Sequence, residues 1–231
     1  MNYTMRWYGP HDPISLKELR QAGVAGVVTA LHQVPVGEVW EVMDIQERIR
    51  IVEAAGLKWK VVESLPVHED IKRQNGDFKV YIENYKQSLR NLAECGLEVI
   101  AYNFMPILDW LRTDHNFERK DGSRVLKYDP VKFAYFDLFL LKREGAEKDY
   151  SSEEIKQAEN LGAQLSSEEK EELFRNILLG LPGSDENFTA EIIKEQLKAY
   201  NYISDDQLRQ NLVHFLSEVA PVAEEVGLKL A

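Results

Sequence analysis

The chain has 231 residues, 44% of them hydrophobic and 29% charged, so it can bury a sizeable core and does not have the composition of a disordered protein. Its formal charge of −11, without any basic block or stripe, excludes non-specific binding to nucleic acid, because phosphates would find no cluster of cations. No apolar run approaches membrane-spanning length, which predicts that the protein makes no membrane segment. The single cysteine, Cys95, and the lack of a signal peptide at the first residues predict a reducing, cytoplasmic location.

Apolar runs typical of strands alternate with helical patterns, which predicts parallel strands joined by right-handed crossovers. The expected strands are Thr4–Tyr8, Val24–Leu31, Leu57–Val62, Leu97–Tyr102 and a short terminal run, Leu228–Ala231. The expected helices begin near Ser15, where Glu18 completes a capping box, at Asp44, at Phe78 and at Asp205. A glycine follows each helical pattern, at Gly23, Gly56, Gly96 and Gly227, because glycine readily takes the left-handed conformation that ends a helix.

The interval from Gly96 to Gly227 is too long for one strand–helix unit, which predicts an insertion over residues 115–203. Its first part, Phe117–Tyr128, has the turn residues of a hairpin. Its second part, Ser151–Tyr202, reads as two or three amphipathic helices, with caps at Ser151, Ser166 and Thr189 and a break at Leu181–Ser184. These helices could form a lid or a contact between copies in a homo-oligomer. A solvated surface excursion is at least as good an interpretation.

The fold class that follows is α/β. We interpret residues 1–231 as a single domain, an incomplete (β/α)8 TIM barrel of about five strands with a hairpin and helical insertion after the fourth strand. If Ala231 is the natural terminus, a shorter open sheet is the alternative.

Polar side chains stand where four of the predicted strands end, and the carboxyl ends of parallel strands meet at one edge. The first three strands supply Arg6, Trp7, Tyr8, His32, Glu63 and His68, and the fourth supplies Asn103, Asp109, Trp110 and Arg112. Histidines and carboxylates brought from different strands could bind a metal or serve as acid and base. From spacing alone, the sequence predicts a barrel with a polar mouth and no more specific chemistry.

Each candidate also has a structural interpretation. Arg6 could stack on its aromatic neighbours, and His32 could be a hydrogen-bonded supporting residue. Glu63 ends an apolar strand, where an unpaired carboxylate is costly to bury, so a site role is favoured for it and, by position, for Asn103. Asp109 and Arg112 could simply pair with each other, and His68 with Glu69 could cap the next segment.

Four segments closely resemble mannonate dehydratase, and the match extends over the whole chain, including Gly145–Tyr150. They are Arg6-Trp-Tyr-Gly-Pro-His-Asp-Pro13, Gly26-Val-Val-Thr-Ala-Leu-His32, Val62-Glu-Ser-Leu-Pro-Val-His-Glu-Asp-Ile71 and Tyr102-Asn-Phe-Met-Pro-Ile-Leu-Asp-Trp110. The resemblance implies a xylose-isomerase-like barrel and a hydro-lyase. The implied reaction removes water from D-mannonate, a small sugar acid, to give 2-keto-3-deoxy-D-gluconate in hexuronate (glucuronate) catabolism, with Fe²⁺ or Mn²⁺.

One departure from the family pattern bears on the metal. In the family, a His-Pro-Asp-Asp-Pro-Pro motif follows the strand that here stops at Ala231, and the metal ligands begin there. The metal ligands are therefore expected beyond Ala231, with none within this chain, and the chain could be inactive alone.

The resemblance and the strand-end positions together assign roles to seven residues. We expect His32 and Glu63 to be catalytic, and Arg6, Tyr8, Asn103, Asp109 and Arg112 to bind substrate. Two alternatives stay open at this point. One is another metal-dependent sugar isomerase or epimerase on the same barrel, and the other is a non-catalytic half-barrel that binds a sugar acid.

Overall fold

A computed structural model describes residues 3–107, 111–178 and 189–231 of the chain, in two compact units. Among the described residues, the first unit comprises the chain up to Pro106 and again from Tyr200 to Ala231. The second comprises described residues from Ile107 to Ala199. Each unit is built around its own hydrophobic cluster.

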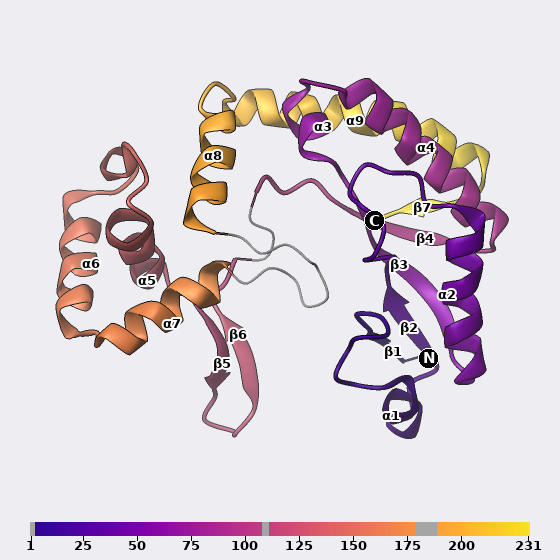
Figure 1. Ribbon diagram of the computed structural model, residues 1–231, viewed down its shortest axis with the longest axis horizontal. Helices are drawn as coiled ribbons and strands as arrows, with labels where there is room; N and C mark the ends of the chain where they lie inside the picture. Colours follow the sequence, from indigo (N-terminus) through magenta and orange to yellow (C-terminus); the bar gives the residue numbers. More distant parts are fainter. Residues whose placement is uncertain (1–2, 108–110, 179–188) are drawn as a thin grey trace. The chain divides into compact units, whose positions relative to one another are not determined.

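The first unit contains a parallel sheet of five strands in the order β1-β2-β3-β4-β7 (Figure 1). The strands are β1 Thr4–Arg6, β2 Gly26–Thr29, β3 Lys58–Pro66, β4 Val99–Asn103 and β7 Lys229–Leu230. The helices that join them are α1 Leu16–Gln21, α2 Val42–Ala54, α3 Glu69–Arg73, α4 Phe78–Glu94 and α9 Asp205–Glu225. In Figure 1, α2, α4 and α9 lie along the outer side of this sheet.

Most of the core of the first unit lies between the sheet and these helices. Leu89 on α4, Ile100 on β4 and Phe215 on α9 are fully buried in one cluster, and the Phe215 ring meets Tyr85 edge-on at 5.0 Å. The apolar residues of α4 recur at helical spacing and therefore form one buried stripe. A smaller cluster under β1 and β2 contains Trp7, so this aromatic side chain belongs to the core.

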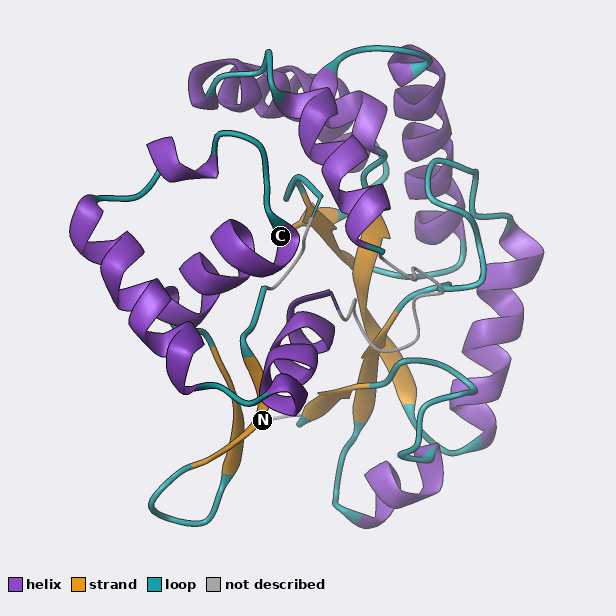
Figure 2. Cartoon of the chain, turned by 60° about the vertical axis from the view of Figure 1, so that its left-hand side comes forward, coloured by secondary structure: helices purple, strands orange, loops and turns teal. Residues whose placement is uncertain are grey.

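The second unit begins with an antiparallel hairpin, β5 Asp114–Glu118 and β6 Arg124–Lys127 (Figure 2). The remaining elements are α5 Pro130–Tyr135, a π-helical turn Phe136–Leu141, a 3-10 turn Ala146–Lys148, α6 Ser152–Gln164, α7 Ser167–Leu178 and α8 Ala190–Tyr200, whose last residue belongs to the first unit. Their buried apolar side chains include Phe136, Leu173 and Ile193.

A buried carboxylate organises the turn between α5 and α6. Asp137, 3% exposed, accepts hydrogen bonds from Arg143 (Nε–Oδ1 2.9 Å, Nη2–Oδ2 2.7 Å) and from the Tyr150 hydroxyl at 2.9 Å. Arg143 also bridges to Asp149. Because the buried charge is both paired and hydrogen-bonded, it stabilises this turn. The Gly145–Tyr150 segment thus has a structural explanation within the second unit.

The five predicted strands are confirmed, as are the capping box at Ser15 and the cap at Ser151, which also forms a capping box with Glu154. The hydroxyls of Ser166 and Thr189 also accept hydrogen bonds from the first turns of α7 and α8, as predicted. The break predicted at Leu181–Ser184 lies outside the described residues. The division into a single domain with a 115–203 insertion stays a prediction.

The first two strands, Thr4–Arg6 and Gly26–Thr29, are shorter than predicted, and three further features differ from the sequence prediction. The helix expected to start at Asp44 starts at Val42, and no side chain caps it. The strand expected to end at Val62 continues to Pro66, which places Glu63 inside it. The helix α3 was not predicted, because five residues are too few to display a helical period.

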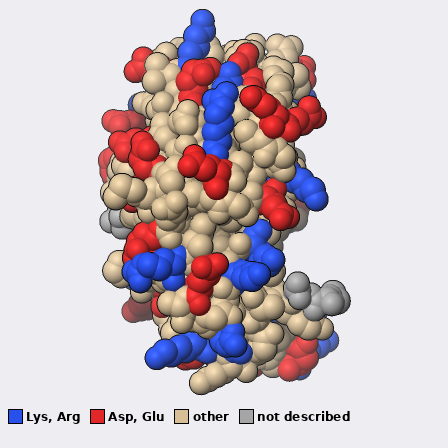
Figure 3. Space-filling view, turned by 90° about the vertical axis from the view of Figure 1, so that its right-hand side faces the viewer, with Lys and Arg blue, Asp and Glu red and all other residues tan. Residues whose placement is uncertain are grey.

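The face of the molecule in Figure 3 carries acidic and basic side chains interspersed rather than gathered into a stripe of one sign. Among the described residues, no helix combines the length and the apolar character needed to cross a membrane.

Gly162 on α6 tests the packing of the second unit. A β-carbon at this position would overlap the ring of Tyr135, which is 8% exposed. We expect Gly162→Ala to destabilise the protein by about 1–3 kcal/mol, because overpacking outweighs the gain in helix propensity. Thermal and urea unfolding would measure this, with the exposed Ala163→Ser on the same helix as control. Wild-type stability of Gly162→Ala would contradict the α5–α6 packing.

Candidate functional site

The carboxyl ends of neighbouring strands bring polar side chains together in the first unit. Arg6 ends β1, His32 follows β2, and Glu63 lies near the end of β3. The register aligns Arg6 with Val28 and Thr29 with Val62, so the strand ends are level. The strand exits predicted from the sequence therefore converge, as parallel pairing requires.

An ion pair between Arg6 and Glu63 is the centre of this cluster. Arg6 Nη1 lies 2.8 Å from Glu63 Oε1, and the two side chains are 22% and 31% exposed. The same guanidinium lies 4.9 Å from the centroid of the Tyr8 ring, within range of a cation–π contact. The contact with the Tyr8 ring agrees with the stacking interpretation of Arg6 made from the sequence, whereas its role in binding substrate stays a prediction.

His32 stands next to this ion pair as a neutral imidazole. Its ring centroid lies 6.3 Å from that of Tyr8. Burial, followed by the charges of Arg6 and Arg48, lowers the pKa of His32 to about 4, because a cationic imidazole would be desolvated and repelled. Its Nε2 atom is buried and has no hydrogen-bond partner among the described residues. The site thus holds a neutral histidine nitrogen that can accept or donate a proton.

Arg48 on α2 supports the β2 exit and was missed by sequence reasoning. It is 5% exposed, and Nη1 donates to the Ala30 carbonyl at 2.6 Å and to the Thr29 hydroxyl at 3.3 Å. Nη2 donates to Gln33 Oε1 at 3.1 Å. These bonds flank His32 in sequence and fix the loop that carries it. Its position in the sequence could have revealed it, because Arg48 falls on the buried apolar stripe of α2, where a cation needs fixed partners.

Asn103 extends the cluster to the fourth strand. Its Nδ2 donates to the Ser64 hydroxyl at 3.0 Å, and the strands pair at Pro66 and Asn103. Since Ser64 is the neighbour of Glu63 in the chain, the amide of β4 is tied to the segment of β3 that holds the carboxylate. The structure therefore gathers Arg6, Tyr8, His32, Glu63 and Asn103 at one end of the sheet.

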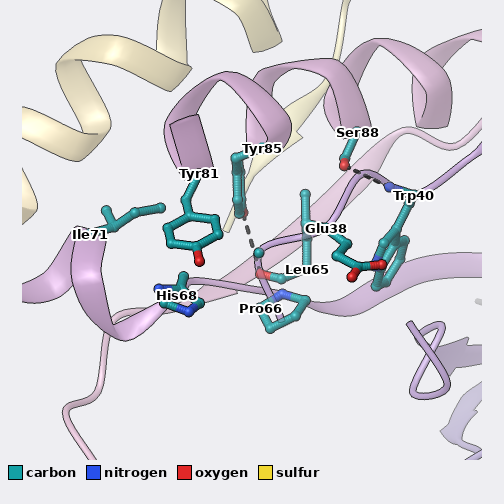
Figure 4. A pocket seen from close by; sticks show the side chains of 10 residues that line it. Glu38, Trp40, Leu65, Pro66, His68, Ile71, Tyr81, Tyr85 and Ser88 are labelled. Atoms are coloured by element: carbon teal, nitrogen blue, oxygen red, sulfur yellow. Dashed lines mark hydrogen bonds between the residues drawn. The ribbon is translucent and has the colours of Figure 1, made fainter. Parts of the chain in front are cut away.

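His68 caps the next helix, which is the second of the two roles considered for it. Its Nδ1 accepts the Asp70 backbone N–H at 3.1 Å, and its ring stacks on Tyr81 at 3.8 Å. Figure 4 shows the small cavity that these residues line, with His68 and Tyr81 at one end and Trp40 and Ser88 at the other. Burial lowers the pKa of His68 more than the nearby carboxylates raise it. A cap with these contacts explains the histidine without a catalytic role.

The remaining candidates are not placed at this site. Asp109 and Trp110 lie outside the described residues, so their position and the suggested Asp109–Arg112 pair are not described. Arg112 belongs to the second unit, where it is 6% exposed.

A parallel sheet that carries a guanidinium, a carboxylate, an amide and a neutral imidazole at its strand ends has the arrangement with which α/β enzymes bind small polar molecules. The family model described as D-mannonate dehydratase (UxuA) matches residues 1–231, and the chain belongs to this family. It is 52% identical to a mannonate dehydratase of Marinomonas sp. over 231 residues, and 49% identical to one of Chromohalobacter salexigens. The chain spans 59% of the length of each of these relatives.

The fold-class prediction is confirmed by a solved structure. The crystal structure of mannonate dehydratase from Streptococcus suis serotype 2 matches with a TM-score of 0.69 and 33% identity, covering 100% of this chain and 52% of that chain. Together with the five parallel strands, this identifies the fold as part of a TIM-like α/β barrel, and the hairpin and helices of the second unit follow β4 in the chain.

The low pKa of His32 makes stability depend on pH. In the unfolded chain the imidazole protonates near its ordinary pKa of 6.5, whereas in the folded chain it does so only near 4. The unfolded state therefore binds more protons in this window, and stability falls as the pH drops from about 6.5 towards 4. We expect the fall in the free energy of unfolding between pH 7 and 4.5 to be about 1–2 kcal/mol smaller in His32→Gln than in the wild type. Urea unfolding at pH 7 and 4.5 would measure it.

The exposed His214→Gln variant controls for the removal of an imidazole as such. An unchanged loss of stability between pH 7 and 4.5 in His32→Gln would mean that His32 is not buried beside the two guanidinium groups.

Proposed function

We propose that this chain provides the sugar-acid site of a mannonate dehydratase, a carbon–oxygen lyase that removes water from D-mannonate to give 2-keto-3-deoxy-D-gluconate. The observation that carries the proposal is the family match over residues 1–231, which includes every strand end of the site. The chain spans 59% of its curated relatives, so the activity of the whole enzyme is part of the proposal.

The strand-end cluster suits the polar groups of D-mannonate. A hydroxyl of the substrate can donate to the Glu63 carboxylate, and the Asn103 amide can both donate and accept. The Arg6 guanidinium can hold the substrate carboxylate while it stays paired with Glu63, since it carries five N–H groups. Its Nε is buried without a hydrogen-bond partner among the described residues, which leaves that donor to be satisfied. Tyr8, beside Arg6, borders the same place.

The proposed role of His32 is to exchange a proton with the substrate. Dehydration breaks a C–H bond next to the carboxylate, whose proton passes to a base, and a C–O bond at the neighbouring carbon, whose hydroxyl takes up a proton and leaves as water. The resulting enol becomes the 2-keto acid. A neutral imidazole nitrogen can take up the first proton, but burial, Arg6 and Arg48 disfavour the imidazolium. An anionic substrate would offset these two charges and raise the pKa of His32 towards neutrality, which is where a base works best.

A divalent cation, Fe²⁺ or Mn²⁺, belongs to the proposal through the family, whose members are generally metal-dependent. Such an ion would act as a Lewis acid on developing negative charge. The described residues include no group of three or more His, Cys, Asp or Glu side chains that could hold a metal ion. The described residues therefore do not fit the ion as a ligand set.

The other elements of the proposal rest on sequence. Asp109 and Arg112 are proposed as further substrate contacts, and the helices of residues 115–203 as a lid or a contact between copies of a homo-oligomer. The reaction is proposed to take place in the cytoplasm, as a step of hexuronate catabolism.

Glu63→Gln tests the site. Replacing the carboxylate by an amide removes the ion pair with Arg6 and a strong acceptor for substrate hydroxyls, so we expect turnover or affinity for D-mannonate to fall at least about tenfold. The assay follows formation of the 2-keto-3-deoxy acid with Fe²⁺ or Mn²⁺ present, alongside direct binding by calorimetry. Glu47→Gln is the matched control, because Glu47 pairs with Arg50 on the exposed face of α2.

Unchanged turnover and affinity in Glu63→Gln would remove Glu63 from the site. A wild-type chain that neither binds D-mannonate nor forms the keto acid would contradict the proposed function. An isomer or epimer as product would support the competing class of sugar isomerases.

A further inference from the structure

The short helix α3 carries an ion pair between a buried lysine and a partly exposed glutamate, which the proposed chemistry does not use. Lys72 is 7% exposed, and its Nζ lies 2.6 Å from Oε1 of Glu69, one turn earlier. A buried ammonium group is costly unless its charge is paired and its N–H groups are hydrogen-bonded. An apolar pair would stabilise so short a helix at lower cost. The contacts that Glu69 and Lys72 make outside α3 therefore indicate what else the pair does.

Lys72 holds the chain just after the fourth strand. Its Nζ also donates to the backbone carbonyl of Met105 at 2.8 Å. Met105 is two residues beyond Asn103, and the first unit ends one residue later, at Pro106. The Asn103 side chain is thus placed between two attachments, its own bond to Ser64 and the bond from Lys72 to Met105.

Glu69 contacts the segment in which the chain returns to the first unit. Its second oxygen, Oε2, accepts a short hydrogen bond from the hydroxyl of Tyr200, the residue at which the first unit resumes. The Arg73 guanidinium lies 5.8 Å from the centre of the Tyr200 ring. Burial and the adjacent Glu69 raise the pKa of Tyr200, which keeps the hydroxyl protonated as a donor.

Helix α3 is itself fixed to the body of the unit. Asn211 on α9, 1% exposed, donates to the Lys72 carbonyl at 2.8 Å, and Gln207 donates to Asn211 in turn. The carbonyl at the end of α3 is therefore satisfied, and the helix has a defined position from which its two charged side chains reach out. One ion pair on one anchored helix contacts both points where the chain leaves and re-enters the first unit.

We propose that Glu69 and Lys72 are positioning residues that clamp these two points and thereby hold Asn103 at the strand-end site. The effect on substrate rests on the proposed function, whereas the clamp itself does not. Neither residue touches the reacting groups. Their effect passes through the Met105 carbonyl to the β4 exit and through the Tyr200 hydroxyl to the returning chain.

Hydrogen–deuterium exchange tests the clamp without substrate. Lys72→Met should raise exchange in both junctions, Phe104–Ile107 and Tyr200–Ile203, at least about tenfold. The matched control is Lys86→Met, because Lys86 is also largely buried and bridges two carboxylates, Glu83 at 2.8 Å and Glu218 at 2.6 Å, within the same unit. Tyr200→Phe removes only one hydroxyl and should raise exchange at the second junction alone. Equal exchange in Lys72→Met and Lys86→Met at both junctions would overturn the clamp.

Binding of D-mannonate by calorimetry tests the consequence for Asn103. Lys72→Met and Asn103→Ala should each weaken binding, and the double variant should be no weaker than Asn103→Ala, because Lys72 acts through Asn103. Additive losses, or wild-type affinity in Lys72→Met, would overturn the positioning role. If the wild-type chain itself does not bind D-mannonate, the proposed function fails, and the exchange experiment alone decides the clamp.

Discussion

The ion pair between Arg6 and Glu63 joins the first strand to the third across the intervening β2, and the rest of the site depends on it. A carboxylate or a guanidinium that is partly withdrawn from water is costly without a partner of opposite charge, and Arg6 and Glu63 supply that partner to each other. The pairing is available only because the strands are parallel and level, so the two side chains end at the same edge of the sheet.

The charges around His32 determine which protonation state and which ligands the strand-end cluster favours. Arg6 shares its charge with Glu63, whereas the described hydrogen bonds of Arg48 go to a carbonyl, a hydroxyl and an amide, none of which is charged. The surroundings of His32 are therefore net positive, which adds to the effect of burial in lowering the pKa of the imidazole and favours a small anion. A site of this kind is compatible with the acidic net charge of −11, because the local field and not the total charge acts on a bound ligand.

Much of the fold could be predicted from the sequence because the relevant signals are local. A glycine after each helix, a serine with glutamate three residues on, and short apolar runs all report the conformation of their own neighbourhood, and the resulting strands pair in sequence order up to β4. The strand-end rule then placed Arg6, His32, Glu63 and Asn103 together. The resemblance to mannonate dehydratase, carried by the same segments, agrees with the family match.

The parts that escaped prediction depend on contacts between distant residues. Arg48 looks like one more charged helix residue until its bonds to the β2 exit are known, and the Glu69–Lys72 pair looks like an ordinary helix pair until Met105 and Tyr200 are found against it. The continuation of β3 to Pro66 likewise follows from its pairing with β4 and not from its own composition.

We propose that the strand ends form a site in which His32 is neutral until an anionic sugar acid binds. An NMR titration of the His32 ring, with and without D-mannonate, tests this most directly. We expect a pKa of about 4 in the free protein and a clear rise when D-mannonate binds. A pKa near 6.5 in the free protein, or no change with D-mannonate bound, would contradict it.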